Sequence, residues 1–140
     1  MIKVRFTSSL LVICFMLLSC MPNENEREHD QTEFTGMIKH TLYFYFKEDV
    51  SDDEKLQFES DLRALLEIPY ISSSLIGRPA QTESRPITDH DFGYTVIMWF
   101  ASVEDHDQYQ IDPLHKQMVE TTGHLFERIR VLDSEMIYQN

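Results

Sequence analysis

The chain has 140 residues, of which 42% are apolar and 26% are charged. This length suits one globular domain with a modest core rather than two domains. Asp and Glu outnumber Lys and Arg by 24 to 12. A surface of that charge repels phosphate backbones, so we expect no nucleic-acid partner.

The first 19 residues have the pattern of a secretory signal. Lys3 and Arg5 form a short cationic region, and residues 10–18 are an unbroken apolar run. A membrane-spanning helix needs about 20 such residues, so this run is too short to be one, and its length and flanks suit a signal peptide. The segment ends in Leu17-Leu18-Ser19-Cys20, which resembles the lipobox of bacterial lipoproteins.

That resemblance predicts a lipoprotein signal peptide at residues 1–19 and lipidation at Cys20. The alternative is an ordinary signal peptide with a chance cysteine. Acyl chains hold a protein on a membrane because each buried CH₂ contributes about 0.8 kcal/mol, so we expect a lipid-anchored chain at the cell envelope. Residues 20–36 are polar and charged and are predicted to form a flexible tether. The folded domain is then expected at residues 37–140.

The folded part begins with a predicted strand at residues 37–47. Apolar side chains alternate with polar ones, and His40 and Phe44 fall on the same face. Tyr43 and Tyr45 point to the opposite face. A sheet covered by helices on one side does not need tyrosines on its second face. The pattern therefore suggests a second layer there, such as a partner subunit.

The remaining elements follow from start and stop signals. Residues 51–54 form a capping box, which predicts a helix that ends before Pro69. A weak strand is expected at 71–78, a loop at 79–92, and the strongest buried strand at 94–101. Residues 102–105 cap a short helix through about 110.

A second start signal follows directly, because Asp112 stands before Pro113 as an N-cap before proline at the first helical position. The apolar side chains of the resulting amphipathic helix are expected to be Leu114, Met118, Leu125, Phe126 and Ile129. A last strand is expected at 130–138.

This order, β-α-β-β-α-β, is the ferredoxin-like α+β arrangement. The helices would cover one face of the sheet. The other face, with Tyr43, Tyr45 and Trp99, is predicted to form a homodimer surface.

Several short motifs resemble one family. The segments at 37–41, 46–47, 62–65, 77–78, 93–95 and 112–115 occur in the order found in the stress-responsive dimeric α/β-barrel (Dabb) family. The resemblance covers roughly residues 37 to 138. It implies a ferredoxin-like fold in which two subunits join their sheets into a dimeric α/β barrel.

The resemblance also implies candidate site residues. In polyketide cyclases of this family, a helix histidine works with a tyrosine six residues before it, and these positions are His115 and Tyr109. The strand histidine that lines the pocket corresponds to His40. Pocket-wall aromatics would fall near Phe58 and Phe126.

Two further positions complete the predicted ligand-binding set. Phe44 shares the face of His40, and Val96 stands where the family often has a histidine after Gly-Tyr-Thr. The valine makes the predicted pocket more apolar.

The leading hypothesis is an envelope lipoprotein whose Dabb domain forms a homodimer and binds a small hydrophobic or aromatic molecule. The alternative is a cofactor-free enzyme, cyclase-like or an isomerase, in which His115 is the general base. The positive end of a helix favours neutral imidazole, and Tyr109 could donate to an oxygen that becomes negative. A cofactor-free monooxygenase is a third option. In the simplest alternative, His115 bonds locally and Tyr109 only packs under the bend.

The sequence also contains candidate metal ligands. His90 with Asp91, and His106 between Asp105 and Asp107, offer suitable atoms but lack the two-histidine helical spacing of known metal motifs. The sequence predicts no structural metal and no cofactor.

Overall fold

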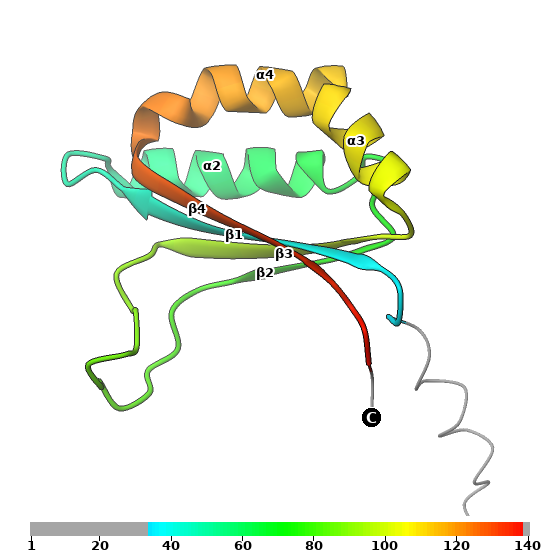
Figure 1. The fold of residues 1–140 in the computed structure, drawn as a ribbon. Helices are drawn as coiled ribbons and strands as arrows, with labels where there is room; N and C mark the ends of the chain where they lie inside the picture. Colours follow the sequence, from blue (N-terminus) through cyan, green and yellow to red (C-terminus); the bar gives the residue numbers. More distant parts are fainter. Residues whose placement is uncertain (1–33, 139–140) are drawn as a thin grey trace, which may run out of the picture.

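The computed structural model describes residues 34–138. The predicted signal peptide, Cys20 and the tether up to residue 33 lie outside this range. The described chain forms an antiparallel four-stranded sheet in the order β2-β3-β1-β4. Helices cover one face of this sheet, and the opposite face carries none (Figure 1). This is the ferredoxin-like α+β fold that the sequence predicted.

The elements follow the predicted order closely. They are β1 (Ile38–Phe46), α2 (Asp52–Leu65), β2 (Ser73–Gly77), β3 (Tyr94–Phe100), α3 (Val103–Ile111), α4 (Pro113–Thr122), a 3-10 turn η1 (Gly123–Leu125) and β4 (Phe126–Glu135). No helix within residues 34–138 has both the length and the apolar character needed to cross a membrane.

Helix α2 starts at the predicted capping box. The Ser51 hydroxyl accepts from the backbone N–H of Glu54 at 3.3 Å, and the Ser51 N–H donates to the Glu54 carboxylate at 2.8 Å. These bonds satisfy N–H groups that have no partner inside the helix. The buried side chains of α2, Phe58, Leu62 and Leu65, then face the sheet.

The end of α4 differs from the prediction. The helix stops at Thr122, and Phe126 and Ile129 lie on β4, where they pair with Phe46 and Phe44 of β1. The expected helix through these two residues was wrong. The spacing of these residues fits a helical period. However, pairing with β1 along the whole strand provides backbone hydrogen bonds that stabilise the strand instead.

The helix-free face of the sheet is partly covered by the chain itself. Phe92, from the loop that extends on this side of the sheet in Figure 1, packs against Tyr43 with ring centroids 5.1 Å apart. Tyr45 donates from its hydroxyl to Asp89 of the same loop at 2.6 Å. Trp99 contacts Phe34, the first described residue. The predicted dimer surface is therefore already lined with ordered aromatic contacts.

Candidate functional site

The candidate site forms where α3 ends and α4 begins. Asp112 has an extended backbone (ψ 135°), and Pro113 follows as the first residue of α4. Proline restricts the residue before it to extended conformations and has no N–H to continue a helix. The chain therefore bends here and brings Tyr109 of α3 next to His115 of α4.

The break changes which groups are hydrogen-bonded. In a continuous helix, the Gln110 carbonyl would accept from the Leu114 N–H. Instead the Leu114 N–H donates to the Asp112 carboxylate at 2.8 Å. The Gln110 carbonyl accepts from Nδ1 of His115 at 3.1 Å. The carboxylate of Asp112 thus has a structural role as a helix cap, and it leaves a backbone acceptor for the imidazole.

This bond fixes the form of the His115 ring. A carbonyl oxygen only accepts, so Nδ1 must carry the hydrogen, and Nε2 of the neutral ring keeps its lone pair. The ring centroids of Tyr109 and His115 lie 4.5 Å apart. An imidazole with a defined basic nitrogen therefore stands against a tyrosine ring.

Tyr109 is 1% exposed, and its ring packs against the rings of His115 and Phe100. Burial raises the pKa of Tyr109 far above its usual value. The phenol stays protonated at neutral pH and keeps a donor for a bound molecule.

A small cavity lies between the sheet and α4 beside these residues. Its volume is about 100 Å³. The wall is mostly apolar and consists of Leu42, Phe44, Leu65, Tyr109, His115, Met118, Val119, Thr122, Gly123, Phe126 and Ile129. Four of the sequence-predicted site residues, Tyr109, His115, Phe44 and Phe126, therefore meet in one wall.

The other predicted residues lie elsewhere. Phe58 is 1% exposed and packs behind the wall, with its ring centroid 5.0 Å from those of Phe44 and Phe126. Val96 is fully buried on β3 opposite Leu42. His40 is buried on the same sheet face but does not line this cavity.

His40 instead belongs to a second group of polar side chains. Its Nδ1 lies 2.5 Å from the Asp133 carboxylate, directly across the β1–β4 ladder. Burial lowers the pKa of His40, and the Asp133 hydrogen bond and charge partly oppose that effect. His106 of α3 stands close, with a centroid distance of 5.1 Å to the His40 ring.

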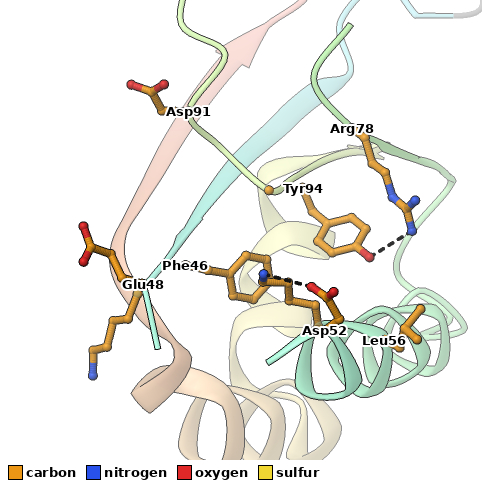
Figure 2. Close-up of a pocket in the computed structure, with 10 residues that line it drawn as sticks. Phe46, Glu48, Asp52, Leu56, Arg78, Asp91 and Tyr94 are labelled. Atoms are coloured by element: carbon orange, nitrogen blue, oxygen red, sulfur yellow. Dashed lines mark hydrogen bonds and ion pairs between the residues drawn. The ribbon is translucent and has the colours of Figure 1, made fainter. Parts of the chain in front are cut away.

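A larger and more open depression lies where the end of β1, the start of α2 and the start of β3 meet (Figure 2). It has a volume of about 510 Å³, and several of its charged side chains are paired: Lys55 with Asp52, and Arg78 with Glu59. Figure 2 shows Arg78 pointing at the Tyr94 hydroxyl, a contact of 3.0 Å. Arg78 also donates to Glu59 at 2.6 Å, as does Tyr94 at 2.7 Å. We place the candidate site in the smaller cavity because it is less open, and its wall contains the Tyr109 hydroxyl and a basic nitrogen of His115.

Sequence reasoning missed several residues that the fold brings to this region. Met118 was expected only as an apolar helix residue, and Thr122 was not singled out, yet both line the cavity. Asp133 was not singled out, because only the β1–β4 register places it opposite His40. His106 was considered only with its sequence neighbours Asp105 and Asp107. Its contacts with β1 depend on tertiary structure and leave no local pattern.

Known structures with the same fold are similar to this chain. A dimeric ferredoxin-like protein of unknown function from Thermobifida fusca superposes with a TM-score of 0.61 at 15% identity, covering 77% of this chain and all of that one. A Dabb family protein from Mesorhizobium loti superposes with a TM-score of 0.59 at 24% identity. The match covers 71% of this chain and 96% of that one. A hydroxynitrile lyase from Passiflora edulis superposes with a TM-score of 0.59 at 20% identity. The match covers 70% of this chain and 91% of that one.

Sequence comparison assigns the family. No protein with a curated description matches the chain. The family model described as the stress responsive A/B barrel domain, Dabb, matches residues 38–136. That range includes every strand and helix described above, and it shows that the chain belongs to the Dabb family.

Proposed function

We propose that this protein is an envelope lipoprotein whose Dabb domain binds a small hydrophobic or aromatic molecule. The observation that carries the proposal is the apolar cavity of about 100 Å³ with Tyr109 and His115 in its wall. An apolar cavity of about 150 Å³ can bind benzene. A one-ring molecule, or the ring end of a larger one, matches this space best. The Tyr109 hydroxyl and the His115 Nε2 would fix its orientation.

The cavity has a side that a larger ligand can reach. Ile129 on β4 lines it and is 44% exposed. Its neighbour Val131 lies on the same strand face at 46% exposure but does not line the cavity. The pair supplies a matched control, because one large side chain can be placed at either position.

The test is calorimetric titration of the chain lacking residues 1–20 with p-cresol, together with identification of any molecule that copurifies. We expect Ile129→Trp to abolish binding and Val131→Trp to retain it. Equal binding by both variants, or no copurifying or added ligand in the parent protein, would contradict the proposal.

The membrane part of the proposal rests on the lipobox-like ending at Cys20. We expect the full chain to fractionate with membranes and Cys20→Ser to abolish its acylation. Metabolic labelling with a clickable fatty acid measures this directly. A labelled Cys20→Ser protein would exclude lipidation at this cysteine.

A homodimer is proposed for the same domain. Similar structures from Thermobifida fusca and Bacteroides fragilis are described as dimeric, the second at 22% identity. The helix-free sheet face presents exposed or half-exposed Leu75, Ile97 and Leu132 beside its tyrosines. An apolar sheet face of this kind is suited to contact a second copy.

A catalytic function is the second candidate, and the fixed tautomer of His115 favours it. A neutral imidazole with Nε2 free can take a proton from a carbon next to a carbonyl, and the Tyr109 hydroxyl can stabilise the resulting oxyanion. A chain of the same fold from Passiflora edulis is a hydroxynitrile lyase. Deuterium incorporation into a small aryl ketone in D₂O, followed by NMR, tests this. We expect His115→Asn to lose exchange, and no exchange by the parent protein would exclude the activity.

A further inference from the structure

The described residues include a group of three potential metal ligands outside the cavity wall. His40 of β1, His106 of α3 and Asp133 of β4 each offer one ligand atom, and these atoms all lie within 4.8 Å of one another. The three residues are far apart in sequence, so only the fold assembles them. From this geometry we propose that the cluster binds a divalent transition-metal ion of the zinc class.

The donor set suits such an ion. Two imidazoles and one carboxylate form the three-ligand set of many catalytic zinc and non-haem iron sites, which leave a position open. Hard ions such as Mg²⁺ and Ca²⁺ prefer oxygen ligands, so the two imidazole nitrogens select against them. The nitrogen-rich set therefore favours a first-row transition-metal ion such as Zn²⁺, for which Co²⁺ is a spectroscopic substitute.

The distances require only small side-chain movements. In a tetrahedral site with bonds of about 2.0–2.1 Å, ligand atoms lie about 3.3–3.4 Å apart. His40 Nδ1 and the Asp133 oxygen are 2.5 Å apart and would separate slightly. The Asp133 side chain is 54% exposed and can turn to allow this. The ligand atom of His106 lies within 4.8 Å of the other two, so it would need to shift by at most about 1.5 Å to reach a tetrahedral spacing.

The partners of His106 support a ligand role. Gln110 Nε2 lies 3.2 Å from its Nε2, and Asp107 lies 3.6 Å from its Nδ1. Whichever nitrogen bound the ion, the other would retain a side-chain amide or carboxylate as neighbour. Such outer partners orient ligating histidines in known sites.

Burial of the cluster is graded from inside to outside. The His40 side chain is 5% exposed, that of His106 17%, and that of Asp133 54%. An ion can therefore enter from the Asp133 side, and water or a ligand can occupy the open position. The Tyr109 ring lies 6.0 Å from the His40 ring and 6.4 Å from the His106 ring, so the ion would stand near the cavity without belonging to its wall.

Binding of Co²⁺ to the full chain in detergent tests the proposal, because tetrahedral Co²⁺ absorbs visible light. We expect one equivalent to bind. His106→Asn and Asp133→Asn should each weaken binding by at least about tenfold, since loss of an outer partner alone costs 10–100-fold. Both residues are partly or largely exposed, so these variants should fold, which circular dichroism checks.

His90→Asn is the matched control. His90 lies in the loop, bonds Thr82 and is outside the cluster, so this variant should bind Co²⁺ like the parent. Zn²⁺ should also raise the melting temperature of the parent and of His90→Asn but not of the two cluster variants. No binding by the parent, or equal binding by cluster and control variants, would overturn the proposal. The second result would place the ion elsewhere, for example on a cysteine.

Discussion

At the scale of single residues, Glu59 of α2 is the centre of a polar network between this helix and the sheet. It accepts from Arg63 at 2.7 Å, from Arg78 at 2.6 Å and from Tyr94 at 2.7 Å. These three donors, with Arg63 the largest contributor, lower the pKa of Glu59 from 4.5 to about 2. The network ties α2 to the strand β3 and to the loop that follows β2.

This lowered pKa predicts a defined acid dependence of stability. A carboxyl whose pKa falls on folding contributes stability that is complete above pH 4.5 and is lost as the pH falls toward about 2. We expect Glu59→Gln to flatten the free energy of unfolding against pH in this window. Urea titrations from pH 5 to pH 2.5 measure it. An unchanged slope, matching that of the exposed control Glu120→Gln, would contradict the assignment.

Gly93 is a second residue whose role the structure explains. A Cβ placed on it would lie 2.5 Å from the Phe46 ring, which is itself packed against Phe58 and Phe126. The Phe46 ring is therefore held on two sides by other aromatic rings. The glycine is therefore needed for close packing and not for an unusual backbone angle.

We expect Gly93→Ala to destabilise the domain by about 1–3 kcal/mol, as overpacking does. Gly123→Ala is the control, because a Cβ there meets nothing within 4 Å and the backbone is helical. That variant should gain about 0.4–1 kcal/mol. Thermal unfolding of both variants measures these changes in stability. If Gly93→Ala is as stable as the parent protein, the Phe46 ring can move to accept the extra methyl group.

At the scale of elements, the helix break at Asp112 connects stability with the site. The cap stabilises the start of α4, and the same bond leaves the Gln110 carbonyl to His115. A substitution here should therefore change two separate observables.

We expect Asp112→Ala to cost about 1 kcal/mol, the usual loss for an N-cap. It should also lower the population of the His115 tautomer that carries its hydrogen on Nδ1, because the freed Leu114 N–H competes for the Gln110 carbonyl. Ser102→Ala, which removes the cap of α3, should cost a similar amount and leave His115 unchanged. Denaturant unfolding and ¹⁵N NMR of the imidazole measure both effects. If the ¹⁵N chemical shifts of the His115 ring are the same in Asp112→Ala as in the parent protein, the Asp112 cap does not control the tautomer of His115.

Most of the helices and strands could be predicted from the sequence because the residues that start and end them are local. Capping residues, prolines and strand alternation located the strands and α-helices of the fold, and the family resemblance pointed to Tyr109 and His115. The exception was the end of α4, where the spacing of Phe126 and Ile129 fits a helix and a strand equally well. Long-range pairing decides such cases. For the same reason, the sequence did not identify Asp133 and His106 as neighbours of His40. Their contacts with His40 exist only after β1, β4 and α3 have assembled.

At the scale of the whole molecule, the helix-free face of the sheet is the proposed dimer surface. It is partly occupied by Phe92 and Phe34 from the same chain. Leu132 on β4 remains 42% exposed on that face. A partner subunit would therefore contact strands and loop together.

We expect the chain lacking residues 1–20 to sediment as a dimer and Leu132→Asp to sediment as a monomer. Leu56→Asp, on exposed α2 in the helical layer, is the control and should remain dimeric. Analytical ultracentrifugation gives the masses. A monomeric parent protein, or a dimeric Leu132→Asp protein with native circular dichroism, would place the interface elsewhere.

The broken helix at Asp112 and Pro113 has a further consequence for how this protein can change. A continuous helix through 112–113 would be the better helix, with every carbonyl satisfied from within and no proline to interrupt it. It would also return the Gln110 carbonyl to the Leu114 N–H and leave the imidazole free to rotate. Substitutions that strengthen this segment thus weaken the order of the site. Selection for a stable helix and selection for a fixed imidazole act in opposite directions at these two residues.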